Sequence, residues 1–391
     1  MKKALPFLLL LSLSVSAFAE VRWRGGIESA AQLDAGPGLH YGLRADALAP
    51  DDEGLFRLGT LFSDKGAAGF SLCWDAHLPL AGLRLSTRLA SLDDPFSPFY
   101  GFNGAAEERN SDADPAHNAF HKAHLQASME VSAPISGALR WQAGFRCHYV
   151  DAGRISSVYG FESATLYDRY KTLDLLRKEE QTGGERISTL IGLNYESEHI
   201  AAALAADISP DLFRDGNAYT RLGGRVSLSQ AFGREERFRL QATLFGQHSL
   251  SGQAPWYLLD ELLLPVHDGA LLRCALPGRL AARGYAGANI DFHAVLMAFH
   301  SASREWKLEA VPFCDLLLLT QTYRLHEMAL ASLGDTDYEQ YLRRRTHLPH
   351  ESAGLKLQLN APDRGLWLQA GAPFHREDGL LCLNLGIRFA F

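Results

Sequence analysis

The most constraining feature of this sequence is a side-chain alternation with a period of two residues, which recurs along the 391-residue chain. In residues 139–149 the odd positions hold Leu, Trp, Ala, Phe, Cys and Tyr, whereas the even positions hold Arg, Gln, Gly, Arg and His. Residues 123–132, 238–244 and 355–359 alternate in the same way. Because successive side chains of a β-strand point to opposite faces, this pattern predicts an all-β chain.

Alternation alone does not say which face is buried. A soluble sandwich buries its apolar face, whereas a membrane barrel turns that face towards lipid and lines its lumen with polar side chains. The alternating segments are about ten residues long, as tilted membrane strands require. Their polar faces carry Arg, Gln, His, Gly and Ser, and the connections alternate between tight turns and long loops. We therefore predict a 16-stranded antiparallel transmembrane β-barrel, an even number as in single-chain bacterial barrels.

The alternation and the turn residues also give the expected strand limits. Long polar or charged connections are expected at 97–121, 153–185, 251–285 and 320–350, with a helical stretch from Tyr323 to Leu333 in the last. The expected strands cover residues 21–34, 39–50, 54–64, 67–80, 82–95, 122–135, 138–152, 186–198, 200–210, 219–232, 237–250, 286–302, 304–319, 351–361, 364–374 and 379–391.

The N-terminus has the form of a secretory signal peptide. Lys2 and Lys3 precede an apolar run at 4–15, and the small residues Ala17 and Ala19 stand where a signal peptidase reads them. The alternative, a membrane anchor, needs a run of roughly 20 apolar residues. We therefore expect residues 1–19 to be a signal peptide and residues 20–391 to be one barrel domain. The expected location is the outer membrane of a diderm bacterium.

The C-terminus carries a second export-related signal. Leu383, Leu385, Ile387, Phe389 and Phe391 share one face of the last expected strand, and the chain ends on that phenylalanine. An aromatic residue at the end of a closing strand places a ring at the membrane interface. The pattern resembles the terminal signal that outer-membrane barrels present to their assembly machinery.

Composition and motifs argue against several other classes of function. The net charge of −7 does not suit nucleic-acid binding, which needs a concentrated basic surface. The five cysteines are odd in number, widely spaced and without a CxxC pair. They indicate neither a disulfide scaffold nor a zinc site, and each is expected to be a small apolar residue on a strand. GxSxG, HExxH, P-loop and GxGxxG motifs are lacking. We predict no enzyme activity and no catalytic, metal or cofactor site.

The connection before the twelfth expected strand carries a family resemblance. It ends in Arg283-Gly284-Tyr285, with Leu276-Pro277-Gly278 shortly before, and Asn289 and the segment 311–315 (Val-Pro-Phe-Cys-Asp) follow. This series resembles the loop and strand motifs of the Omp85 superfamily, the bacterial surface antigen D15 barrels. That superfamily includes barrel-assembly proteins and two-partner-secretion transporters. The resemblance is strongest over residues 270–391.

The resemblance implies a particular site. In the family this loop folds back into the lumen, so Arg283 would pair with Asp315 on the thirteenth strand. Gly284 would allow a tight backbone, and Tyr285 would pack against the lumen wall. The sequence also departs from the family pattern. The family's acidic residue on the twelfth strand is expected near Leu296 or Met297, and neither of these residues is acidic. The expected strands also begin too close to the cleavage site to leave room for POTRA repeats.

The resemblance implies a role in membrane-protein assembly or in protein translocation and secretion. The partners it implies are outer-membrane lipid, the assembly machinery during biogenesis, and a client polypeptide or a POTRA-bearing protein. Two alternatives stay open. One is a passive porin or channel tuned by polar residues such as Arg140, Gln142, Arg146 and Arg239. The other is a surface adhesin or structural barrel that acts through its long loops. Whether the barrel forms a homodimer is also left open.

Overall fold

The structure is a computed structural model in which most of the chain is described. The described residues are 26–33, 39–48, 54–78, 82–102, 115–156, 164–212, 218–259, 263–264, 271–275, 278–301, 304–325, 349–361, 364–375, 378–379 and 381–390. The expected signal peptide and the last residue, Phe391, lie outside these ranges.

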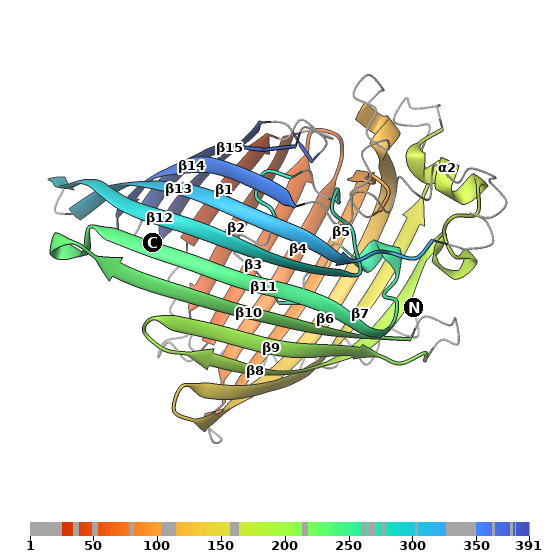
Figure 1. Cartoon of the computed structure of the whole chain (residues 1–391), viewed down its shortest axis with the longest axis horizontal. Helices are drawn as coiled ribbons and strands as arrows, with labels where there is room; N and C mark the ends of the chain where they lie inside the picture. Colours follow the sequence, from red (N-terminus) through yellow and green to blue (C-terminus); the bar gives the residue numbers. More distant parts are fainter. Residues whose placement is uncertain are drawn as a thin grey trace.

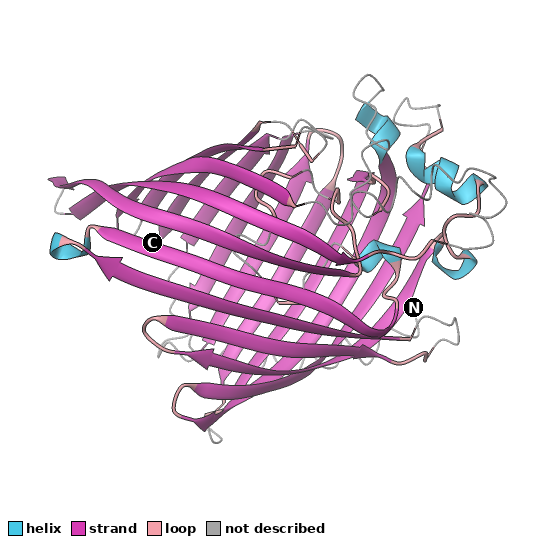
Figure 2. Ribbon diagram, in the orientation of Figure 1, coloured by secondary structure: helices cyan, strands magenta, loops and turns pink. Residues whose placement is uncertain are grey.

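The described residues form one antiparallel sheet in which each strand pairs with its neighbours in the sequence (Figures 1 and 2). The first strand, β1, also pairs with the last, β16, so that the sheet closes on itself. The strands are β1 (Gly26–Leu33), β2 (Leu39–Leu48), β3 (Gly54–Ser63), β4 (Ala68–His77), β5 (Arg84–Pro98), β6 (Ala119–Ser136), β7 (Leu139–Gly153), β8 (Gly183–Glu196), β9 (Ile200–Ser209), β10 (Tyr219–Phe232), β11 (Phe238–Gly252), β12 (Gly284–Ser301), β13 (Arg304–Gln321), β14 (His350–Ala361), β15 (Arg364–Pro373) and β16 (Cys382–Ala390).

The prediction of an all-β antiparallel chain is confirmed. Short helical segments interrupt the connections, and they are η1 (Pro115–Asn118), α2 (Leu166–Thr172), η3 (Lys178–Glu180), η4 (Arg234–Glu236) and η5 (Trp256–Leu258). Helix α2 was not expected. A capping box between Thr165 and Asp168 begins it, and that Thr-x-x-Asp spacing was visible in the sequence. Residues 322–325, where a helix was expected to begin, have no regular structure, and residues 326–333 lie outside the described part of the chain.

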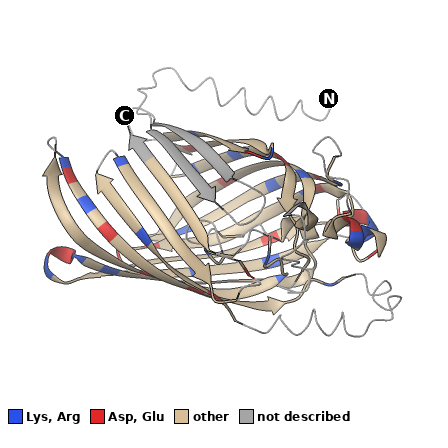
Figure 3. Cartoon of the chain, turned by 90° about the horizontal axis from the view of Figure 1, so that it is seen from above, with Lys and Arg blue, Asp and Glu red and all other residues tan. Residues whose placement is uncertain are grey.

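The sheet carries its apolar side chains on the outside. On β8, Arg186, Ser188 and Leu190 are buried and face inward, whereas Ile187 and Ile191 lie between them and are exposed. Charged positions occur along several strands and in the helical segments at the ends (Figure 3). A soluble sandwich would bury its large aliphatic residues, so the exposure pattern is the one expected of a barrel with an apolar surrounding. No helix within the described ranges is both long and apolar enough to span a membrane.

The strands differ greatly in length around the sheet. At about 3.4 Å per residue, the 18 residues of β6 span roughly 61 Å, whereas the 8 described residues of β1 span roughly 27 Å. Strands β5 to β7 therefore extend beyond their neighbours at one end, where α2 and the adjoining loops gather (Figure 1). This end of the barrel carries the structures described next.

Candidate functional site in the lumen

The connection between β11 and β12 runs through the inside of the barrel. We call residues 253–283 the lumen loop, of which 253–259, 263–264, 271–275 and 278–283 are described. Lys122 on β6 donates from Nζ to the carbonyl of Tyr257 at 3.2 Å. The N–H of Leu263 donates to Oε1 of Gln247 on β11 at 3.2 Å. The loop thus contacts inward-facing residues on well-separated parts of the wall, as the family resemblance implied.

The centre of the attachment is Arg273, which is buried against two aspartates. Its Nε and Nη2 donate to the carboxylate of Asp315 at 3.0 and 2.5 Å, and its Nη1 donates to Asp291 at 2.6 Å. The backbone N–H of Arg273 donates to the same Asp315 carboxylate at 3.1 Å. Asn289 and Ser352 donate to it as well, at 2.8 and 3.0 Å. The oxygens of Asp315 are therefore well supplied with donors.

Strand register explains why these side chains meet. Asn289 on β12 lies directly across from Asp315 on β13, and Asp315 lies directly across from Ser352 on β14. The three residues form a transverse row on the inner face. Phe313, two residues before Asp315, shares that face because alternate side chains point the same way. Its ring lies under the guanidinium of Arg273, 4.0 Å from centroid to Cζ.

The electrostatics of this cluster make the attachment strong. Asp315 and Asp291 are almost completely buried, and the side chain of Arg273 is 4% exposed. Charges removed from water in this way persist only when they are paired and hydrogen-bonded. The planar guanidinium satisfies this by binding Asp315 through two nitrogens and Asp291 through the third. We call Arg273, Asp315, Asp291, Asn289 and Ser352 the loop latch.

The predicted pairing of Arg283 with Asp315 is wrong, because Arg273 occupies that position. Arg283 lies just before β12, where its Nη2 donates to the carbonyl of Gly252 at 2.7 Å and its N–H to the carbonyl of Gln321 at 3.0 Å. Six residues separate it from Asn289, the cross-strand neighbour of Asp315, a distance of about 20 Å along a strand. An arginine side chain does not reach that far. The missed signal was a lone arginine within the apolar run Leu271-Leu272-Arg273.

Gly284 and Tyr285, the other predicted residues of this motif, lie at the start of β12. A Cβ on Gly284 would meet the Gln321 side chain at 2.9 Å and the backbone of Gln247 at 3.0 Å, so this close approach favours glycine. Tyr285 is buried on the inner face, where its ring packs edge-on against Phe245. Both residues shape the base of the lumen loop rather than the latch.

The acidic residue expected near Leu296 or Met297 lies elsewhere. Both of these residues are exposed, and the carboxylate on β12 that binds the loop arginine is Asp291. A register irregularity between Val295 and Met297 separates the two parts of the strand. The position of the acidic residue was therefore mislocated by about five residues.

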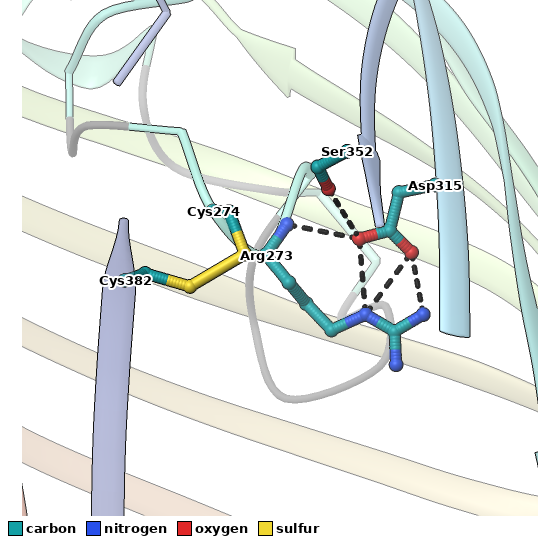
Figure 4. The surroundings of a disulfide bond; sticks show 5 residues. All are labelled: Arg273, Cys274, Asp315, Ser352 and Cys382. Carbon is teal, nitrogen blue, oxygen red and sulfur yellow. Dashed lines mark hydrogen bonds and ion pairs between the residues drawn. A yellow bond between two sulfur atoms is a disulfide. The ribbon is translucent and has the colours of Figure 1, made fainter. Parts of the chain in front are cut away.

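A disulfide lies beside the latch, which corrects the prediction that each cysteine is a lone apolar residue. Cys274 in the lumen loop is bonded to Cys382, the first residue of β16 (Figure 4). Both residues are buried, and they pack with Phe313. Cys73, Cys147 and Cys314 are not disulfide-bonded in the described part of the chain. The pairing joins positions separated by 108 residues, so sequence spacing gave no indication of it.

An aromatic cluster lies where the long strands end. We call this the cap, formed by Phe99, Phe102, Phe120, Tyr167, Tyr170, Trp256, Tyr257 and Tyr323 together with neighbouring aliphatic residues. These side chains come from several connections, including the lumen loop, and many of the rings meet edge to face. Such contacts favour a single packed arrangement. The cap thus adds a further attachment for the first part of the lumen loop.

A carboxyl group is buried in the cap. Glu180 accepts a hydrogen bond from the hydroxyl of Tyr323 at 2.5 Å and from the N–H of Trp256 at 3.3 Å, and Arg177 lies 3.5 Å away. Burial raises the pKa of the Glu180 carboxyl, although the Tyr323 hydrogen bond and the charge of Arg177 act in the opposite direction. The folded cap therefore favours the protonated form.

The expected C-terminal signal is described only in part. Leu383, Leu385 and Ile387 are exposed on the outer face of β16. The side chain of Phe389 and all of Phe391 lie outside the described residues, so their role stays a prediction. In the described ranges no group of three or more His, Cys, Asp or Glu residues has an arrangement that could hold a metal ion.

No protein-family model matches the chain, and no curated protein sequence matches it. Several solved structures of barrel proteins match the structure of this chain. BamA from Haemophilus ducreyi lacking POTRA domains 1–3 matches with a TM-score of 0.58 and 13% identity, over 94% of this chain and 71% of that one. CdiB from Escherichia coli matches with a TM-score of 0.63 and 11% identity, over 95% of this chain and 64% of that one. CdiB from Acinetobacter baumannii matches with a TM-score of 0.53 and 7% identity, over 94% of this chain and 60% of that one.

These likenesses concern the fold. The chain has the barrel fold of BamA and CdiB, which confirms at that level the Omp85 resemblance seen in the sequence. It spans less than two thirds of the length of either CdiB.

Proposed function

We propose that this protein is a 16-stranded transmembrane barrel of the bacterial outer membrane that handles other polypeptides, in membrane-protein assembly or in protein secretion. The observation that carries the proposal is the lumen loop, held inside the barrel by Arg273 and Asp315. A loop fixed there by buried charges occupies the space through which a passive pore would conduct. The argument rests on three features of the described residues: the outer surface, the lumen and the seam.

The outer surface supports a membrane location. Large aliphatic side chains such as Ile191, Leu204 and Leu244 are exposed on the outside of the wall. Water would disfavour an apolar surface of this extent, whereas lipid is its natural surrounding. Closure of the sheet through β1 and β16 also satisfies backbone groups that lipid cannot bond. Residues 1–19 would supply the export signal.

The lumen supports a role other than passive conduction. The lumen loop binds β6 through Lys122, β11 through Gln247, β13 through Asp315 and β16 through Cys382. It therefore crosses the interior between distant parts of the wall. An open porin keeps a water-filled channel, so the porin alternative has less support. The described residues offer no specific observation in favour of an adhesin.

The seam between β1 and β16 supports the handling of strands. Its described pairing runs from Gly26 opposite Ala390 to Leu33 opposite Leu383, and it joins the first strand of the sheet to the last. When the seam parts, each edge offers unpaired backbone groups to which a client strand can add. The partners proposed are lipid, the assembly machinery during biogenesis, client polypeptides and a separate POTRA-bearing protein.

The test is depletion of the protein followed by quantitative outer-membrane proteomics. The full chain is returned as wild type, as Arg273→Ala or as the matched control Arg237→Ala, which removes an exposed arginine from the turn before β11. We expect other barrel proteins, or one secreted polypeptide, to be lost on depletion. Wild type and Arg237→Ala restore them, and Arg273→Ala does not.

The alternatives give different results in the same experiment. An unchanged protein inventory with altered uptake of small solutes would refute the proposal in favour of a porin. An unchanged inventory and unchanged uptake, with loss of surface binding, would refute it in favour of an adhesin. Heat-modifiable migration on gels shows whether Arg273→Ala still forms a barrel, so that a folding failure is recognised.

A further inference from the structure

The Cys274–Cys382 disulfide occupies an informative place in the fold. Cys274 directly follows the latch residue Arg273, and Cys382 directly precedes Leu383, where the described pairing of the seam begins. The bond therefore connects the lumen loop to the strand that closes the barrel (Figure 4). Gly371 of β15 leaves space for the bond, because a Cβ at this position would lie 2.7 Å from the sulfur of Cys274.

The lumen loop thus has two kinds of attachment to one side of the barrel. The latch binds it to β13 through Asp315 and to β12 through Asp291, by charges and hydrogen bonds. The disulfide binds it covalently to β16. Between β1 and β16 the structure describes backbone strand pairing. Hydrogen bonds between strands part more readily than a covalent bond, so we expect a yielding seam to open between the two strands.

We propose that the Cys274–Cys382 bond makes the lumen loop and β16 one mechanical unit, so that the seam parts with the loop retained on the β16 side. This inference rests on the proposed function only in that it takes the seam as the place of opening. The bond would be formed during assembly, in the oxidising envelope. The two thiols lose two protons and two electrons to the disulfide of an envelope thiol oxidoreductase, which becomes a dithiol.

Burial fixes the order of these events. Both sulfurs belong to residues that are at most 5% exposed in the closed barrel. An oxidoreductase cannot approach them there, so oxidation comes before the loop is fully packed or while β16 is docking. Once packed, the bond is shielded from small reductants. The two ends of the bond then remain together through any later opening of the seam.

The first measurement counts thiols on the full chain, extracted from membranes and denatured with a maleimide mass tag. Five cysteines are present and two of them form the disulfide, so three tags are expected before reduction and five after it. Cys274→Ser should show four tags before reduction. Cys314→Ser, which removes an outward-facing thiol, is the matched control and should show two. Five tags on the unreduced wild type would overturn the proposal.

The second measurement follows hydrogen exchange of residues 271–275 and of β16 in the folded barrel while urea loosens the seam. In the wild type and in Cys314→Ser the two segments should exchange together. In Cys274→Ser, in Cys382→Ser or in reduced wild type, the loop should exchange earlier, by about 30- to 1,000-fold, the range that a typical disulfide implies. Equal exchange with and without the bond would overturn the proposal.

These readouts are independent of any client. A barrel that fails the proteomic test can still show coupled exchange, so failure of the proposed function and failure of this inference are distinguishable. Reduced wild type serves as the second sample where a serine variant does not fold.

Discussion

Replacing Arg273 by alanine is the sharpest test of how the lumen is filled. The substitution removes the side-chain donors that bind Asp315 and Asp291. Asp315 keeps Asn289, Ser352 and one backbone N–H, whereas Asp291 loses its ion pair with Arg273. Both carboxylates stay buried. Removing one partner of a buried ion pair typically costs about 3–5 kcal/mol.

That free energy corresponds to a change of about 100- to 4,000-fold in the equilibrium between docked and released loop. The neighbouring disulfide conceals part of the effect, because it keeps the loop near its site after the latch has failed. The substitution is therefore made both in the wild type and in Cys274→Ser. Non-additivity of the two changes measures how strongly the latch and the bond depend on each other.

The assay is hydrogen exchange of residues 271–275 in the folded barrel, with Arg237→Ala as the control for loss of an arginine. Arg273→Lys should give an intermediate result, because lysine retains the charge but cannot bind two carboxylates with a planar fork. The latch would be refuted if the double variant Arg273→Ala/Cys274→Ser exchanged at a rate within about threefold of that of Cys274→Ser. A ratio of that size corresponds to a free energy well below that lost when one partner of a buried ion pair is removed.

Two further predictions concern the cap and the seam. Because burial raises the pKa of Glu180 above its unfolded value, the contribution of this carboxyl to cap stability is fully present below the unfolded pKa and is lost as pH rises towards the folded one. Glu180→Gln should remove that pH dependence and increase exchange protection of η5 at neutral pH, and less protection than in the wild type would contradict the assignment. At the seam, Ala31→Cys with Leu385→Cys places two thiols at paired positions. In a chain without the native disulfide, oxidation of this pair should stop client handling and reduction should restore it, whereas unimpaired handling by the locked barrel would exclude opening at this seam.

The strands were predictable because their signal is local. Alternation at 139–149 predicted β7, and the turn at Gly137, where φ is +50°, separates it from β6 as expected. Lumen and lipid faces were assigned from the length and composition of the strands, and Arg186 and Ile187 lie on the sides that this assignment requires. Strand ends differed by a few residues, since turns and pairing partners decide them.

The contacts of the lumen loop were less predictable because they depend on distance in space. A motif match selected Arg283, but the register of β12 and β13 places Asp315 beyond its reach and within reach of Arg273. Likewise, Cys274 and Cys382 meet only when β16 is in place. The spacing of cysteines along the chain does not predict such a disulfide. The type of site and its carboxylate Asp315 were predictable, whereas the arginine that binds it was not.

The transverse row of Asn289, Asp315 and Ser352 has a consequence for the timing of assembly. A slip of one residue in either strand pairing would turn the side chains of one strand to the outer face. The loop arginine therefore finds its full set of partners only after β12, β13 and β14 have paired in the native register. The cysteine beside it must wait longer, for the last strand. Latch formation, and oxidation while β16 is docking, would thus act as checkpoints on the wall, and a barrel paired out of register would leave both thiols reduced.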